Sequence, residues 1–442
     1  MSATNEKQDD NSLAISVSDP VQQTEGSMNK KYTSYKVNVY SPVPNFLSFT
    51  GNFSVLRRYS DFNWLHDSLL KEFPGACVPP IPEKQAVARF NPEFVEQRRV
   101  GCERFLRRVA AHPELFEAVC FKQFIQADDI QFAMHKREFS NAEKNKAKDG
   151  IFQWVAETKT SMKNDLVRSP EDELFEEITH YVTSLESQMK NVAQHTSVLV
   201  RKGKELANGL FEFGLAFTLL GQSEADSLGG ALTQVGHTAD TLSVLSADQA
   251  DKEAAKFEEP LIDYIKLIQA LKHALAKRQE KRVTYSTNLG NVSEKQNLVN
   301  KYNGIFGKED KAAHANISLQ HAQHACEISR VDYINVSQRV LREVDRFKRE
   351  KEQAMRQTVM DYIILQVEYN KRMEEVWGSL LPQLESVNLD GQPQEGTQNQ
   401  APIPPISGNG LTMESGSDIK FYVSGRPPHA GPGPKEVAGA GM

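Results

Sequence analysis

The sequence predicts two unlike parts in one chain: an α+β domain with a three-stranded sheet and helices, followed by an elongated all-α domain of three long helices. Strand-like alternation near the N-terminus indicates the first part. A sustained 3-4 spacing of apolar residues indicates the second, because that spacing keeps one helix face against neighbouring helices. Long helices gain most of their stability from packing, so we expect this part to be dimeric.

The N-terminal domain is expected over residues 12–129. Three segments have the composition of strands: 13–20, 32–40 and 53–62. In the second, Tyr35, Val37 and Val39 alternate with polar neighbours, the period of a half-buried strand. Helical patterns follow on both sides of a proline-rich loop, which cannot be helix interior because proline lacks the amide donor.

The clearest helical periodicity starts after Pro170. Apolar or small residues stand at positions 175, 178, 182, 185, 189, 192, 196, 199, 203, 206, 210, 213, 217 and 220. We expect this row of side chains to be the buried face of the first long helix. A second helical region is expected to run to about Tyr302 with a kink at Pro260. A third is expected over 312–387, with its buried face marked by Val336, Val340, Val344 and Phe347.

Composition assigns the remaining segments. Residues 1–11 are expected to be a disordered lead and 130–149 a polar linker. Residues 150–166 form an amphipathic helix candidate, and the long helices occupy 170–388. The Gly- and Pro-rich stretch 389–442 cannot bury a core, so we expect it to be disordered.

Bulk properties exclude several classes of protein. The formal net charge is -6, so attraction to an anionic surface must come from local basic clusters. The four cysteines show no C-x-x-C pairing, which argues against a disulfide framework or zinc site and fits a reducing cytosol. We find no secretory signal, and no apolar run approaches the roughly 18 residues of a membrane span. No nucleophile, P-loop or metal motif is present, so we expect no enzyme, cofactor or bound metal.

Three separated motifs carry the recognisable chemistry: R-R-Y-S-D-F at 57–62, P-P-I-P-E-K at 79–84 and E-Q-R-R at 96–99. Guanidinium groups bind phosphate oxygens through forked hydrogen bonds, and a lysine contributes a point charge. A tyrosine supplies a flat surface for a sugar ring. Together these residues predict a site for a phosphorylated sugar.

The three motifs, in this order, resemble the phox-homology (PX) domain, a reader of phosphatidylinositol 3-phosphate. The resemblance implies that Arg58 binds the 3-phosphate with help from the Ser60 hydroxyl, and that Tyr59 lies under the inositol ring. It also implies that Lys84 contacts the 1-phosphate and Arg98 the ring hydroxyls.

The segment 340–351 and the residues after it resemble the last helix of the BAR domain in PX–BAR sorting nexins, closest to the sorting nexin one and two branch. In that family the BAR dimer is a curved rod that presents basic residues to lipid. The resemblance implies that Lys308 and Lys311 are membrane-contacting residues at its tip. Basic clusters on the long helices, including Lys277-Arg278-Lys281-Arg282, are candidates for the concave face.

The 150–166 segment resembles the amphipathic helix that precedes this module in the family. Ile151, Phe152, Trp154 and Val155 would then insert into the headgroup region of a membrane. The alternative is a helix that packs on the bundle.

The resemblance implies a non-enzymatic peripheral adaptor on the cytosolic face of early endosomes. It would bind phosphatidylinositol 3-phosphate and other anionic lipids, and would sense or induce curvature as a homodimer or as a heterodimer with another PX–BAR sorting nexin. It would act with the retromer trimer in endosomal sorting and retrograde transport, with no nucleic acid partner. Two alternatives are a soluble coiled-coil scaffold whose PX domain binds a protein, and a lipid-dependent enzyme that uses the PX domain for targeting.

Overall fold

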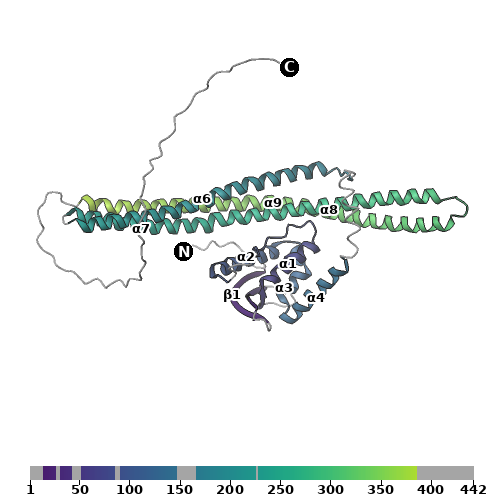
Figure 1. The fold of residues 1–442 in the computed structure, drawn as a ribbon, viewed down its shortest axis with the longest axis horizontal. Coiled ribbons are helices and arrows are strands. Elements are labelled where there is room, and N and C mark those ends of the chain that lie inside the picture. Colours follow the sequence, from purple (N-terminus) through teal and green to yellow (C-terminus); the bar gives the residue numbers. More distant parts are fainter. Residues whose placement is uncertain are drawn as a thin grey trace, which may run out of the picture. The chain divides into compact units, whose positions relative to one another are not determined.

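The computed structural model describes the following residues: 13–25, 30–41, 51–84, 90–146, 166–224 and 227–385. Figure 1 gives the order of the elements along the chain. Three expectations lie outside these residues: the lead at 1–11, the membrane-inserting residues Ile151, Phe152, Trp154 and Val155, and the tail at 389–442. No helix in the described part is long and apolar enough to cross a bilayer.

The N-terminal sheet has three antiparallel strands in the order β1-β2-β3, as predicted. They are β1 (Ala14–Glu25), β2 (Lys30–Ser41) and β3 (Gly51–Arg58). Tyr35, Val37 and Val39 are buried, which confirms the alternation. The first strand is longer than expected, because it continues past an irregularity between Ser18 and Val21.

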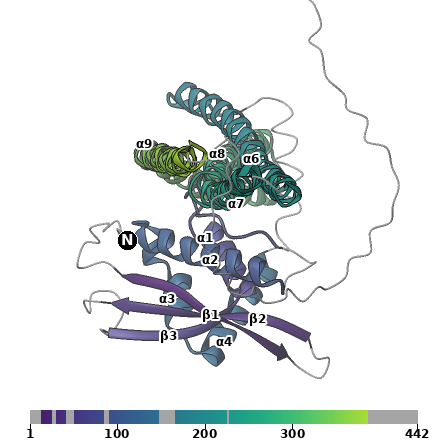
Figure 2. The same cartoon turned by 90° about the vertical axis from the view of Figure 1, so that its left-hand side faces the viewer.

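Helices complete the N-terminal domain: α1 (Tyr59–Glu72), α2 (Pro92–Ala111), the short 3-10 helix η1 (Leu115–Glu117), α3 (Val119–Gln126) and α4 (Asp129–Lys146). Figure 2 shows α1 and α2 on one side of the sheet. Phe62 and Phe124 meet edge to face in the core at a centroid distance of 5.0 Å. Alternating strand residues and one face of each helix therefore share a single core.

Residues 130–146 of the expected polar linker form the helix α4, which was not predicted from the sequence. Asp128 accepts hydrogen bonds from the backbone N–H groups of Ile130 and Gln131, which caps the helix start. Phe132 is buried against Trp64, with ring centroids 5.1 Å apart. Phe139 also packs on Trp64, at 5.9 Å between ring centroids. Two aromatic anchors and a cap therefore hold this polar segment on the domain, and composition does not reveal them.

The second half consists of long helices: α6 (Asp172–Ser223), α7 (Ser227–Glu253), α8 (Glu259–Tyr302) and α9 (Glu309–Glu385). A π-helical turn, η2 (Ala254–Glu258), joins α7 to α8 and ends just before Pro260, where a kink was predicted. Proline cannot donate to the preceding turn, and a wider turn accommodates that loss. Val336, Val340, Val344 and Phe347 on α9 are buried as predicted.

The buried face of α6 differs from the prediction from Val192 onward. Five residues of the predicted buried row have side chains with 44–53% of their surface exposed: Val192, Leu199, Leu206, Phe213 and Leu220. The neighbouring row is buried instead: Ala193, Val200, Ala207, Gly214 and Gly221. A Cβ on Gly214 would lie 2.8 Å from the carbonyl oxygen of Gly236, so small residues let α7 approach closely. The helix therefore has two apolar rows, and α7 covers only the smaller one.

The expectation that Arg278 and Arg282 belong to an exposed concave basic face is also wrong. Arg278 is 4% exposed, and its guanidinium donates to Asp172 at 2.5 Å and to the Tyr333 hydroxyl at 2.6 Å. Arg282 lies 2.7 Å from the same carboxylate. Buried ion pairs of this kind favour one register between helices, so these arginines join α6 to α8 and α9.

Candidate functional site

The first basic motif lies at the turn from β3 into α1. The backbone N–H of Arg58 donates to Oδ2 of Asp61 at 2.9 Å, and Oδ1 of the same carboxylate accepts from Lys136 at 2.6 Å. Asp61 therefore fixes the helix start. The Arg58 side chain is 38% exposed, and its guanidinium lies 5.4 Å from the Tyr32 ring centroid.

The proline-rich loop is held against this turn from two sides. The Tyr59 hydroxyl donates to the carbonyl oxygen of Pro82 at 2.5 Å. Nη2 of Arg98 on α2 donates to the carbonyl oxygen of Glu83 at 3.3 Å. A Cβ on Gly101 would lie 2.6 Å from Cγ of Pro82, so a glycine is needed for the helix to approach the loop. Three segments far apart in sequence thus converge.

Arg98 lies at the centre of this convergence and is 8% exposed. Its guanidinium carbon is 4.1 Å from the Tyr59 ring centroid and 4.3 Å from that of Phe94, a cation–π contact on each side. Its Nε is buried and has no hydrogen-bond partner among the described residues. Burial raises the pKa of the Tyr59 hydroxyl, although the charge of Arg98 acts in the opposite direction. The tyrosine therefore stays neutral at physiological pH and acts as a hydrogen-bond donor.

The last two predicted residues are exposed at the edges of the site. Ser60 occupies the first turn of α1, where backbone N–H groups lack helical acceptors and attract anions. Lys84 follows Glu83 directly, so the Arg98 hydrogen bond positions the backbone that carries it. The structure brings Tyr59 and Arg98 together with the loop that carries Lys84, and Arg58 directly precedes Tyr59.

Arg57 has a different role from its neighbour Arg58. It is 1% exposed, and its Nε donates to the carbonyl oxygen of Phe124 at 2.9 Å. Its remaining nitrogens donate to the carbonyl oxygen of Ala127 and, at 3.2 Å, to Asp129. Because successive residues of a strand point to opposite faces, Arg57 serves the core while Arg58 stays at the site.

Sequence reasoning missed Phe94 and Gly101, which complete the walls of the site. A glycine within a helical pattern signals a close approach of another backbone, so Gly101 could have been recognised. Phe94 has no such signal. The assembled site offers guanidinium groups, a lysine, a hydroxyl and a helix N-terminus around an aromatic ring, which suits a phosphorylated polyol.

Comparison with known proteins identifies two families along the chain. The family described as "Vps5 C terminal like" matches residues 152–383, and the PX domain matches residues 48–128. Sorting nexin 1 of Arabidopsis thaliana is 29% identical over 386 residues, which cover 85% of this chain and 93% of that protein. Human sorting nexin-2 is 27% identical over 389 residues, covering 85% of this chain and 73% of that protein.

The chain belongs to the Vps5 family of PX–BAR sorting nexins. The same fold is found in the cryo-EM structure of the SNX-BAR Mvp1 tetramer, with a TM-score of 0.51, 17% identity and coverage of 83% of this chain and 99% of that one. Sorting nexins of this family are peripheral, membrane-associated proteins of endosomal sorting that act as adaptors. They bind phosphoinositide lipids and form dimers.

In this sorting nexin the predicted tip lysines lie where α8 turns into α9. Lys308 is half-buried, with its ammonium 5.8 Å from the Tyr302 ring centroid, and Lys311 is exposed. They stand at the end of the helical hairpin, far along the chain from the PX residues. Their contact with membrane stays a prediction.

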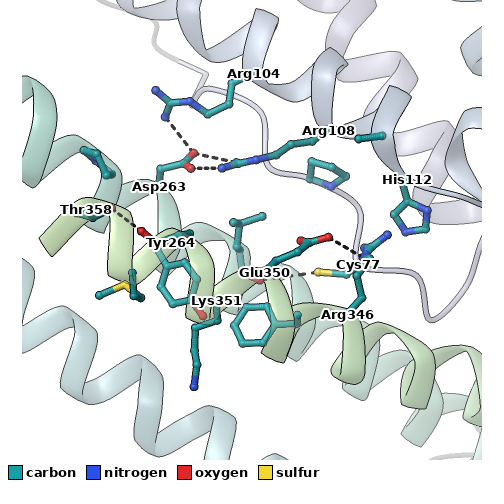
Figure 3. Close-up of a pocket in the computed structure, with 17 residues that line it drawn as sticks. Cys77, Arg104, Arg108, His112, Asp263, Tyr264, Arg346, Glu350, Lys351 and Thr358 are labelled. Atoms are coloured by element: carbon teal, nitrogen blue, oxygen red, sulfur yellow. Dashed lines mark hydrogen bonds and ion pairs between the residues drawn. The ribbon is translucent and has the colours of Figure 1, made fainter. Parts of the chain in front are cut away.

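The PX domain also contacts the long helices of this sorting nexin (Figure 3). Asp263 on α8 accepts two hydrogen bonds from Arg108 on α2 and pairs with Arg104 at 3.2 Å. Burial raises the pKa of Asp263, but the two arginines outweigh it and bring that pKa below its ordinary value. A cavity of about 490 Å³ lies beside these pairs, between α2 and helices α8 and α9. Sequence patterns give no sign of this junction, because its partners are remote along the chain.

Proposed function

We propose that this sorting nexin binds phosphatidylinositol 3-phosphate through its PX domain. The observation that carries the proposal is the convergence of Tyr59 and Arg98 with the loop before Lys84, next to Arg58 at the start of α1. Arg58 and the first turn of α1 take the 3-phosphate, with the Ser60 hydroxyl as a further donor. Because a phosphate has several acceptor oxygens, guanidinium and backbone N–H groups can share one headgroup.

The inner end of the headgroup meets Arg98 in this proposal. Its Nε is buried without a described partner, and a donor left in that state costs free energy that a ligand hydroxyl recovers. The Tyr59 ring, fixed by its hydrogen bond to Pro82, supports the inositol face. Lys84 reaches the 1-phosphate as a flexible point charge at the exposed edge.

We further propose that the exposed apolar row on α6 pairs with a second BAR-containing copy. Leu206 and Phe213 on α6 are 53% and 44% exposed, and Ile363 on α9 is 53% exposed. Exposed apolar residues spaced along two helices form a surface of the kind that a permanent interface covers. The partner is a second copy of this chain or another PX–BAR sorting nexin.

A dimer gives the membrane reader two PX sites and two helical tips. Linked weak sites gain roughly 10²–10⁴ in avidity without new contacts. With Lys308 and Lys311 at each tip, we propose that the dimer senses or induces curvature on the cytosolic face of early endosomes. There it acts with the retromer trimer in the retrograde transport of cargo.

Vesicle co-sedimentation tests the lipid proposal, with and without phosphatidylinositol 3-phosphate in otherwise identical vesicles. We expect Arg58→Gln to weaken the lipid-dependent binding about tenfold or more, the effect of losing a charge-assisted hydrogen-bond pair. Arg137→Gln, the same substitution at an exposed residue of α4, is the matched control and should bind as the unaltered chain does.

Equal binding of Arg58→Gln and the unaltered chain to all anionic vesicles would exclude the PX pocket as the targeting site. A PX domain used for binding protein would give that result.

Light scattering tests the proposed dimer interface separately. The unaltered chain should have the mass of a dimer, and Leu206→Glu should shift it to a monomer. An unaltered chain that is already monomeric would leave only the heterodimer with another sorting nexin.

A further inference from the structure

The loop between α8 and α9 presents two apolar side chains at its apex. Phe306 is 100% exposed and Ile305 is 42% exposed. An exposed phenylalanine is unfavourable in water, by roughly the free energy that its burial would return. No side chain of the described residues shields Phe306. Packing within the described part of the chain therefore does not account for a phenylalanine at this position.

The loop is an ordered structure that holds these side chains outward. Gly304 and Gly307 have φ values of +75° and +79°, the left-handed region where a side chain is strained. The backbone N–H of Lys308 donates to the carbonyl oxygen of Ile305 at 3.2 Å, and that of Gly307 donates to Oε1 of Glu309 at 3.1 Å. These glycines and hydrogen bonds make a tight turn with Phe306 at its outermost point.

The apex stands at the end of a two-helix arm. The backbone N–H of Val167, just before α6, donates to the Ser286 hydroxyl at 2.9 Å. From Ser286 to Tyr302, the end of α8, is 16 residues (302 − 286), or about 24 Å of helix. Figure 1 shows α8 and α9 continuing together as a hairpin beyond the start of α6. The arm places the apex clear of the rest of the bundle.

Lysines surround the apolar apex. The ammonium groups of Lys301 and Lys308 lie 5.9 and 5.8 Å from the Tyr302 ring centroid, and Lys311 is exposed in the first turn of α9. The nearby acids are Glu309, which caps Gly307, and Asp310; both lie in the first turn of α9, where the helix dipole offsets their charge. An apolar point with an aromatic ring and lysines behind it matches the boundary between lipid tails and headgroups.

The area of the apex separates a bilayer from a protein partner. Two side chains offer far less than the roughly 800 Å² that each partner buries in a stable protein interface. A bilayer needs no minimum contact area, because each apolar side chain that enters it contributes its own favourable transfer free energy. The basic surroundings also favour anionic lipid over another copy of the same basic tip.

We propose that Ile305 and Phe306 form an apolar wedge that inserts into the headgroup region of an anionic bilayer, with Lys301, Lys308 and Lys311 at the lipid phosphates. The proposal rests on the proposed function only in that the helical module meets a membrane. It does not require the PX pocket. The wedge adds a hydrophobic contact to the predicted electrostatic one at Lys308 and Lys311.

The test compares binding of the full chain to phosphatidylserine vesicles without phosphoinositide. We expect Phe306→Ser to bind about tenfold more weakly, from the loss of one inserted aromatic side chain, and Phe306→Leu to keep most of the affinity. Ile328→Ser removes a 53% exposed side chain from the side of the arm and should change nothing. Because Phe306 is fully exposed, its replacement should leave the melting temperature unchanged.

A direct readout places an environment-sensitive dye on Phe306→Cys, with Cys326→Ser removing the more accessible native thiol. Vesicles should raise and blue-shift its emission, and lipid-borne quenchers should reduce it. The same dye on Gln320→Cys, an exposed residue along α9, should not respond. The proposal would be overturned if vesicles did not change the emission of the dye at position 306, or if Phe306→Ser bound vesicles as tightly as the unaltered chain.

Two further outcomes distinguish the wedge from a contact between copies of the chain and from lipid binding by the PX domain. A Phe306→Ser chain whose mass in solution falls without vesicles would overturn the wedge and assign the apex to a contact between copies. If the unaltered chain ignores phosphatidylinositol 3-phosphate, the PX proposal fails. The Phe306 comparison on phosphatidylserine vesicles still decides the wedge in that case.

Discussion

The backbone N–H of Cys77 donates a hydrogen bond of 3.1 Å to Oε2 of Glu343, which lies 266 residues further along the chain. Glu343 is on α9 and 4% exposed, and it also accepts from Arg346 at 2.6 Å. Its Oε1 is 3.1 Å from Nε2 of His112. Nδ1 of that ring accepts the backbone N–H groups of Glu114 and Leu115, which holds the ring beside the carboxylate. A single carboxylate on the long helices thus binds two groups of the PX domain.

Glu343→Ala should loosen the PX domain from the helices, because it leaves the buried Cys77 N–H without its acceptor and the Arg346 guanidinium with Glu350 alone. We expect a loss of about 2–3 kcal/mol in the free energy of unfolding. Hydrogen exchange at the Cys77 amide should accelerate. Glu352→Ala, at an exposed position further along the same helix, is the matched control. Equal exchange in both variants would show that the junction does not depend on Glu343.

Gly75→Ala should disturb the same junction by steric overlap. Gly75 has a φ of +86°, and a Cβ there would lie 2.8 Å from Cγ1 of Val336 and 3.1 Å from Cγ2 of Val340. We expect a cost of about 2–4 kcal/mol in urea unfolding, from strain plus overpacking. Gly51→Ala has a φ of +114° with nothing within 4 Å, so it carries the strain alone and should cost less. Equal costs would mean that the PX domain is not held tightly on α9.

Arg57→Gln should destabilise the PX domain, whereas Arg58→Gln should not. The first change leaves the carbonyl oxygens of Phe124 and Ala127 buried without their donors. We expect it to cost about 3 kcal/mol in unfolding free energy, against less than about 0.5 kcal/mol for Arg58→Gln. Thermal unfolding of both variants measures this. If Arg58→Gln proves the less stable of the two, its loss of lipid binding could not be attributed to the pocket.

The stabilising effect of Glu186 should depend on pH in the acid range. Hydrogen bonds from Lys190 at 2.7 Å and Lys272 at 2.5 Å lower the pKa of Glu186 from 4.5 to about 2. A carboxylate whose pKa falls on folding contributes all its stability above its unfolded pKa of 4.5 and loses it as the pH falls toward 2. The unaltered chain should therefore exceed Glu186→Gln by about 1 kcal/mol at neutral pH. Urea unfolding at decreasing pH should show that difference shrinking, and a constant difference would refute the assignment.

Much of the local structure could be predicted from the sequence. The alternation of Tyr35, Val37 and Val39 and the spacing of Val336, Val340 and Val344 identified buried faces correctly. Each pattern repeats within one helix or strand, so it can be recognised without knowing which element packs against it. The three basic motifs likewise predicted a site, since their residue types and order carry the phosphate chemistry. The end of β1 and the start of α4 were missed, because an irregularity and a cap decided them.

Only the tertiary structure decided which of several equivalent surfaces is covered. On α6 the sequence favoured the row with Leu206 and Phe213, yet α7 packs on the row with Ala207 and Gly214, because small residues permit a closer approach. The sequence of a helix shows its apolar rows, whereas which row becomes buried depends on the helix that packs against it. The sequence by itself determined the elements and the chemistry of the PX motifs. Contacts between distant residues, such as Cys77 with Glu343, arose only from folding, because no local period records them.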